Sequence, residues 1–124
     1  MKKIRLRGRV VSGLGEGAKY VLLYREAFIR YLGINPYPGT LNIDVGHDAS
    51  EALAKAKSIA IPPPSPGYGE VHAYRAFFNG LQVYVIKPVI TRHSRNIIEV
   101  VSSLNLRRKL GLRDGSLVEV VVMA

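Results

Sequence analysis

Hydrophobic and basic residues alternate along the first segment of the chain, residues 4–11. A period of two places successive side chains on opposite faces, so this segment is predicted to be a strand with one solvated face. A glycine-rich loop follows, and the apolar run at residues 20–23 is predicted to be a short return strand. Apolar residues within 24–33 then recur at helical spacing, and Gly33 is predicted to end that helix.

The remainder of the chain is predicted to be mostly strands joined by turns. Two β-rich runs flank Asn79-Gly80, a dipeptide typical of a tight hairpin. Short helices are predicted at 50–57, with Ser50 as the cap, and within 104–112, ending near Gly111. Further strands are predicted at residues 41–45, 96–102 and 117–123. Six or seven irregularly spaced strands indicate a mainly β fold, a compact β-barrel with short helical insertions.

The composition narrows the classes of protein. The 124 residues, 48% of them hydrophobic, predict one globular domain over residues 1–124. No run of apolar residues is long enough to span a membrane, and arginines interrupt the basic start where a signal peptide would need an apolar core. We therefore expect a cytoplasmic protein. Cysteine is absent, which excludes disulfides and thiolate metal sites.

The charge is strongly positive. Eighteen Lys and Arg stand against nine Asp and Glu, a formal net charge of +9. Such an excess attracts polyanions, either nucleic acid or a phosphorylated small molecule. An ordinary solvated basic surface has the same composition, so charge alone leaves these alternatives open.

The glycine loop is the first candidate site. Gly13, Gly15 and Gly17 lack the Cβ atoms that would keep an anion away from the backbone, so successive N–H groups can form a concave nest for phosphate. Lys19 can add a positive charge. The alternative is a flexible hairpin loop in which glycines supply positive φ angles.

A second candidate lies in the sequence PYPGTLN, residues 36–42. Thr40 and Asn42 are two residues apart at the start of a predicted strand, so their side chains point to the same face. Their hydroxyl and amide oxygens are ligands that Mg²⁺ accepts alongside phosphate oxygens and water. The alternative is an ordinary Pro-Gly turn followed by a strand threonine.

A third candidate is Glu99, which lies within the apolar run IIEVV. A carboxylate there needs hydrogen-bond donors, from an arginine or from the N–H groups of a bound heterocycle, unless it simply faces outward. Arg107 and Arg108 can pair with phosphate or lie on a solvated helix face.

The order of these motifs carries more information than any one of them. GRVVSGLGEGAKY, then LGINPYPGTLNIDV, then TRHSRNIIEVVSSLNLRRKLGLRDGSLVEVVV resembles the archaeal CTP-dependent riboflavin kinase family. The resemblance covers essentially the whole chain and is weakest over residues 49–83. It implies a small six-stranded cradle-loop (RIFT-type) barrel, related in topology to swapped-hairpin transcription factors. It also implies transfer of the γ-phosphate of CTP to riboflavin, giving FMN and CDP, with Mg²⁺ as cofactor.

The resemblance also implies roles for particular residues. Thr40 and Asn42 match the Mg²⁺ ligands, and Thr91 and Glu99 match the flavin-contacting pair. The nucleotide-binding positions are Leu14, Gly15, Glu16, Gly17, Ala18, Lys19, Leu104, Asn105, Leu106 and Arg107. The loop reads GEGAKY, one residue longer than the family's usual GEGxY, so either Ala18 or Lys19 supplies the last N–H group. No general base is implied.

The expected partners are therefore riboflavin or FMN and CTP or CDP, without membrane or nucleic acid, for a monomeric phosphotransferase. The chain starts directly at the barrel, so we expect no N-terminal winged-helix domain. Two other functions fit the same residues: a DNA-binding protein of the swapped-hairpin type, suggested by the charge and topology, and a flavin- or nucleotide-binding protein without catalysis.

Overall fold

The computed structural model describes residues 2–13, 15–89 and 94–124. Its strands are β1 (Lys3–Val11), β2 (Leu41–Asp44), β3 (Ser58–Ile61), β4 (Val71–Phe78), β5 (Leu81–Pro88), β6 (Ile97–Val101) and β7 (Leu117–Met123). Its helices are α1 (Gly17–Leu23), α2 (Arg25–Leu32), α3 (Ser50–Leu53) and α4 (Leu106–Leu110). The prediction of a mainly β fold with short helices is confirmed.

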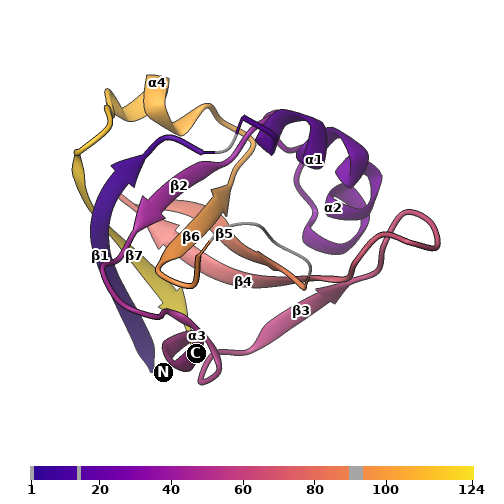
Figure 1. Cartoon of the computed structure of the whole chain (residues 1–124), viewed down its shortest axis with the longest axis horizontal. Coiled ribbons are helices and arrows are strands. Elements are labelled where there is room, and N and C mark those ends of the chain that lie inside the picture. The colour runs from indigo at the N-terminus through magenta and orange to yellow at the C-terminus, as the bar shows by residue number, and fades with distance from the viewer. Residues whose placement is uncertain (1, 14, 90–93) are drawn as a thin grey trace.

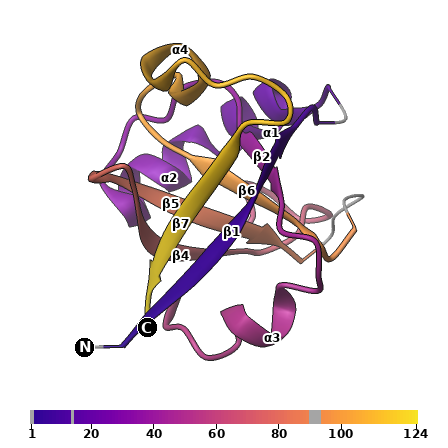
Figure 2. The same ribbon diagram turned by 90° about the vertical axis from the view of Figure 1, so that its left-hand side faces the viewer.

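The strands form one antiparallel sheet that closes on itself (Figures 1 and 2). The order is β3-β4-β5-β6-β2-β1-β7, and β7 also pairs with β4 through Ala76↔Val122 and Phe77↔Val121. That pairing joins six strands into a ring. Strand β3 lies outside the ring and pairs with the first half of β4, along the edge whose second half is taken by β7.

Two hydrophobic clusters lie on opposite sides of this sheet. The inner cluster fills the ring with side chains from all six of its strands, among them Val10, Ile43, Val85, Val100 and Val120. The outer cluster packs α1 and α2 against the outer face of β3, β4, β5 and β6, as Figure 1 shows. The two helices therefore cover one flank of the ring, next to β6 and β2.

Turn residues set the ends of several elements as predicted. Asn79 and Gly80 have φ angles of 49° and 77°, the left-handed pair that a two-residue hairpin between β4 and β5 needs. Gly33 and Gly111 end α2 and α4 in the left-handed conformation. Strand β7 has the predicted bounds.

Three predictions about local structure are wrong. Residues 20–23 belong to α1, because Val21, Tyr24 and Phe28 form one buried helical stripe that continues into α2. A four-residue apolar run cannot by itself distinguish strand from helix. The helix predicted at 50–57 stops at Leu53, and its cap is Ala49, while the Asp48 carboxylate accepts a hydrogen bond from the Ser50 N–H at 2.8 Å. Strand β3 was not predicted at all.

None of the described helices is long and apolar enough to cross a membrane.

Candidate active site

The polar candidates meet on the outer face of the ring, beside α1. Asn42 on β2 lies directly opposite Glu99 on β6 in the strand register. Their neighbours Ile43 and Ile98 point into the inner cluster, so Asn42 and Glu99 face outward. Both are nevertheless buried, with 7% and 9% of their surface exposed. Two polar side chains thus lie opposite each other on the outer face of the sheet, both shielded from solvent.

Thr40 completes this group. Its Oγ1 lies 3.2 Å from Asn42 Oδ1, and its hydroxyl is also within hydrogen-bond reach of the Glu99 carboxyl. Neighbouring ligands of an octahedral Mg²⁺ with bonds of 2.0–2.1 Å are separated by about 3.0 Å. The spacing of the two side-chain oxygens therefore fits two adjacent positions around a divalent cation. Glu99 contacts Thr40 and not the cation position, so its carboxyl can orient the threonine hydroxyl.

The glycine loop packs directly on this oxygen pair. A Cβ atom on Gly13 would clash with the Asn42 amide, and one on Gly17 would lie 3.1 Å from Thr40 Oγ1. Gly15 instead has a φ of 81°, which favours glycine for conformational reasons. Close approach thus explains two of the three glycines. The loop leads into α1, so the alternative of a hairpin loop is wrong.

Burial changes the acidity of Glu99. It raises the pKa of the Glu99 carboxyl to about 7, and the hydrogen bond with Thr40 partly opposes this shift. The carboxyl is therefore close to half-protonated near neutral pH, and it can accept or donate a hydrogen bond to a bound molecule.

The predicted nucleotide segment lies beside the same group. Thr40, Leu104, Leu106 and Arg107 all line one cavity of about 50 Å³ between the PYPGTLN segment and α4. Asn105 has a structural role, since its side chain accepts a hydrogen bond from Arg108 N and donates one to the Tyr37 hydroxyl at 3.1 Å. The structure therefore brings the second predicted nucleotide-binding segment next to Thr40.

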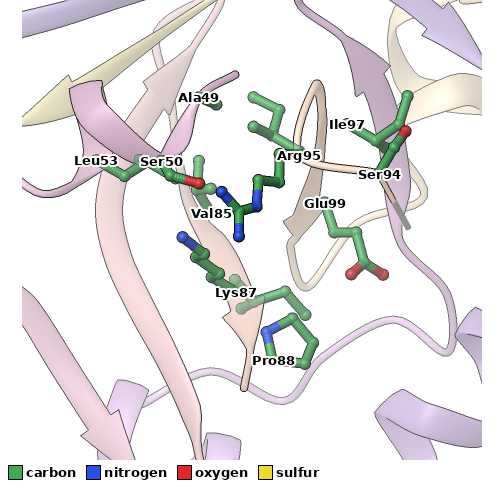
Figure 3. A pocket seen from close by; sticks show the side chains of 12 residues that line it. Ala49, Ser50, Leu53, Val85, Lys87, Pro88, Ser94, Arg95, Ile97 and Glu99 are labelled. Carbon is green, nitrogen blue, oxygen red and sulfur yellow. The ribbon is translucent and has the colours of Figure 1, made fainter. Parts of the chain in front are cut away.

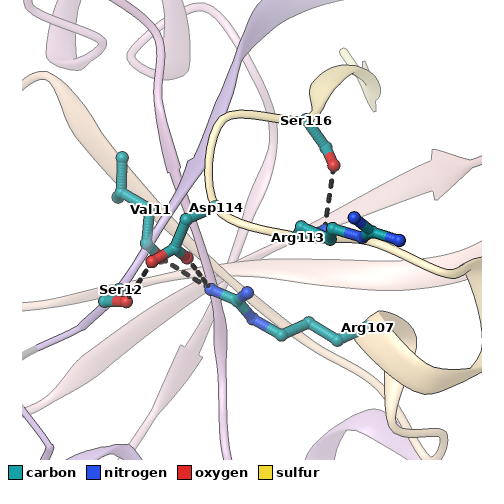
Figure 4. A network of polar contacts seen from close by, with 6 residues as sticks. All are labelled: Val11, Ser12, Arg107, Arg113, Asp114 and Ser116. Atoms are coloured by element: carbon teal, nitrogen blue, oxygen red, sulfur yellow. Dashed lines mark hydrogen bonds and ion pairs between the residues drawn. The ribbon is translucent and has the colours of Figure 1, made fainter.

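Arg107 also ties the glycine loop to the turn before β7, as Figure 4 shows. Its Nη2 donates to Asp114 Oδ1 at 2.6 Å and to the Val11 carbonyl at 3.2 Å, while Ser12 Oγ donates to Asp114 Oδ2 at 2.5 Å. The bonds from Ser12 and Arg107 hold the pKa of Asp114 below its usual range. The start of the loop is thereby fixed from two distant parts of the chain.

Comparison with known proteins identifies the family. The family model CTP-dep_RFKase, described as a domain of unknown function (DUF120), matches residues 10–122. The chain belongs to the CTP-dependent riboflavin kinase family. It is 55% identical to a riboflavin kinase of Staphylothermus marinus over 96% of this chain and 92% of that protein.

Other relatives in this family are longer than the chain. A riboflavin kinase of Pyrobaculum arsenaticum is 47% identical over 97% of this chain and 61% of its own length. One from Archaeoglobus fulgidus is 40% identical over 97% of this chain and 55% of its own length. The chain thus spans about three fifths of these two relatives. Members of the family are kinases that use riboflavin and a nucleotide together with a divalent metal ion.

Glu99 also lines a second cavity of the riboflavin kinase domain, about 60 Å³ in volume (Figure 3). Apolar side chains including Val85, Ile97 and Ile98 line it together with Lys87 and Arg95. No local pattern in the sequence singles out these two cations. Glu99 thus borders both the Thr40 group and a separate, partly apolar cavity.

Two predicted site residues, Leu14 and Thr91, lie outside the described residues. Of the others, Gly15, Glu16, Gly17, Ala18 and Lys19 span the end of the glycine loop and the first turn of α1. Ser12, Asp114 and Tyr20 were missed by sequence reasoning. The first two are 102 residues apart, and no local pattern marks a contact between a loop and a distant turn.

Proposed function

We propose that this chain transfers the γ-phosphate of CTP to the ribityl 5′-hydroxyl of riboflavin, giving FMN and CDP, with Mg²⁺ as the metal ion. The observation that carries the proposal is the packing of the glycine loop on the Thr40–Asn42 oxygen pair. A loop suited to phosphates and two oxygens suited to a cation lie in contact, as phosphoryl transfer requires.

Each part of the site has a role in this reaction. The backbone N–H groups of the glycine loop and of the first turn of α1, including those of Ala18 and Lys19, hold the CTP phosphates. Thr40 and Asn42 hold Mg²⁺, which when bound neutralises charge on the transferring phosphate. Their neutral oxygens leave more of the cation's charge available for phosphate than carboxylates would.

The remaining residues of the site position the two substrates for the transfer. Residues 104–107 support the cytidine part of the nucleotide, beside the cavity that Leu104, Leu106 and Arg107 line with Thr40. Glu99, together with Thr91, orients riboflavin so that its 5′-hydroxyl faces the γ-phosphate. The hydroxyl oxygen forms the new bond to phosphorus, the bond from phosphorus to the β–γ bridging oxygen breaks, and CDP leaves with that electron pair. The hydroxyl proton passes to solvent, because a loose transition state needs no strong base.

We further propose that residues 1–124 act as a single, monomeric, cytoplasmic kinase domain that does not bind nucleic acid. Among the basic residues of β1, Arg5 and Arg7 both pair with Glu119, at 3.0 and 2.6 Å. Their charge is thereby partly neutralised, which argues against a DNA-binding face on this strand. Size-exclusion chromatography with light scattering tests the monomer, and duplex titration at low salt tests the absence of DNA binding.

The test is an assay of FMN formation by the purified chain with riboflavin, MgCl₂ and each nucleoside triphosphate in turn. FMN should form with CTP, and much more slowly with ATP, GTP or UTP. Chelation of the metal should stop the reaction. If no triphosphate yields FMN while riboflavin or CTP still binds, the chain is a binding protein without catalysis. Equal rates with ATP would contradict the CTP preference alone.

A further inference from the structure

We propose that the hydroxyl of Tyr20 is a hydrogen-bonding partner of riboflavin and fixes the flavin beside Glu99. Tyr20 is a positioning and specificity residue in this assignment. The inference rests on the proposed function, because it names a further contact of the same substrate site.

The first argument is position. Tyr20 follows Gly17 by three residues in α1, so the two lie on the same face of that helix. Gly17 faces Thr40, and the Thr40 hydroxyl reaches the Glu99 carboxyl. Tyr20 also packs at the edge of the outer cluster, against the sheet face that carries Glu99. The phenol is therefore directed toward the buried polar group of the site.

The second argument is a missing partner. The Tyr20 hydroxyl is shielded from solvent and makes no hydrogen bond within the part of the chain that the structure describes. A buried polar group without a partner is unfavourable and rare. The two other tyrosines of the outer cluster differ: the Tyr24 hydroxyl donates to the Gly69 carbonyl at 2.7 Å, and the Tyr84 hydroxyl donates to the Leu32 carbonyl at 3.1 Å. Tyr20 alone of these three is left for a ligand.

The chemistry of the phenol favours the flavin over the nucleotide. Burial, with the nearby Tyr24 and Glu99, raises the pKa of Tyr20 far above its usual range, so the hydroxyl stays neutral. A neutral phenol both donates and accepts one hydrogen bond, which suits the ribityl hydroxyls and the carbonyl and N–H groups of a flavin ring. The anionic phosphates of CTP are instead served by the glycine loop and the cation. The ring of Tyr24 stacks on that of Tyr20, with centroids 4.7 Å apart, and so supports the position of the Tyr20 ring from within the protein.

The test is Tyr20→Phe, which removes the hydroxyl and retains the ring. Riboflavin affinity, measured by calorimetric titration, should fall about tenfold, the size of one lost hydrogen bond to a buried group. The KM for riboflavin should rise by a similar factor, while the KM for CTP and kcat stay within about threefold of the wild type. Thermal stability without ligands should not fall, because the hydroxyl has no protein partner to lose.

Tyr24→Phe is the matched control. It removes a hydroxyl that does have a partner, so it should lower the melting temperature and leave riboflavin affinity unchanged. Unchanged riboflavin affinity in Tyr20→Phe would overturn the inference, and so would a loss confined to CTP. A fall in melting temperature as large as that of Tyr24→Phe would assign Tyr20 a structural role and also overturn it. These outcomes apply only if the wild type makes FMN. If the wild type neither binds nor phosphorylates riboflavin, the proposed function itself is overturned.

Discussion

The two faces of strands β2 and β6 differ sharply, although alternate residues of the same two strands build them. The inner face carries Leu41, Ile43, Ile98 and Val100, all buried in the cluster that fills the ring. The outer face carries Asn42 and Glu99, equally inaccessible but polar. The inner face stabilises the fold by burying apolar surface. The outer face holds polar groups in place for chemistry, because α1 and the glycine loop cover them.

In each of these strands, one face therefore supports stability and the other supports activity. A substitution on the inner face should lower stability and spare the site, and one on the outer face should lower activity without a comparable loss of stability. The following changes test that separation, in order of decreasing expected effect.

Asn42→Ala should reduce kcat/KM for FMN formation about 100-fold or more, because it removes one of two oxygens that hold the cation. The Mg²⁺ concentration for half-maximal rate should rise, and the melting temperature should change little. Steady-state assays over a Mg²⁺ series measure both constants. Asn35→Ala is the matched control, since the Asn35 side chain contacts Arg25 on the surface. Full activity of Asn42→Ala would refute the metal assignment.

Ile43→Ala changes the adjacent residue on the opposite face. Ile43 is fully buried, so its truncation should lower the free energy of unfolding by about 3 kcal/mol. The rate of FMN formation per folded molecule should remain near that of the wild type. Denaturant unfolding and activity measured on the same sample give the two values. Loss of activity without loss of stability would break the separation of the two faces.

Because Glu99 on the outer face is buried, it should make the free energy of unfolding depend on pH. Its pKa is raised in the folded protein, so the fold favours the neutral acid. The contribution of Glu99 to stability is complete below the pKa of its carboxyl in the unfolded chain, near 4.5. It is lost as the pH rises through the pKa of the folded protein, about 7. Glu99→Gln should remove this loss, which amounts to about 3 kcal/mol between pH 4.5 and 8 at 1.36 kcal/mol per pKa unit. Denaturant unfolding of the metal-free protein between pH 4.5 and 8 measures it. If the free energy of unfolding changed with pH in the same way in the variant and the wild type, Glu99 would not be the group responsible.

Gly17→Ala should have the smallest effect. Alanine is a better helix former than glycine, so α1 should not lose stability. The added methyl group would lie 3.1 Å from Thr40 Oγ1 and 3.3 Å from the Thr40 backbone nitrogen, so it should displace the hydroxyl by a few tenths of an ångström. A shift of this kind should lower kcat/KM about tenfold. Wild-type kinetics would show that the loop does not need this close contact.

The sequence predicted those parts of the fold that depend on local pattern. Alternation identified β1, and Asn79-Gly80 identified the hairpin of β4 and β5. Helix α1 was missed because Val21 is buried by contacts with distant strands, which no four-residue window contains. Strand β3 was missed because its four residues are short and next to prolines.

The candidate site shows the same limit. That Thr40 and Asn42 share a face was predicted from the two-residue repeat of side chains along a strand. Their contact with Glu99 depends on the register of β2 against β6, and the bond from Ser12 to Asp114 depends on the closure of the ring. The unpartnered hydroxyl of Tyr20 is a property of the packed structure alone.

The most direct measurement of the central claim is the fate of the γ-phosphate of CTP, followed by ³¹P NMR in the presence of riboflavin and Mg²⁺. The outer-face site predicts one FMN and one CDP for each CTP consumed by the wild type, and transfer by Asn42→Ala at about one hundredth of that rate or less. Consumption of CTP with release of inorganic phosphate in place of FMN, or equal transfer by the variant, would contradict it.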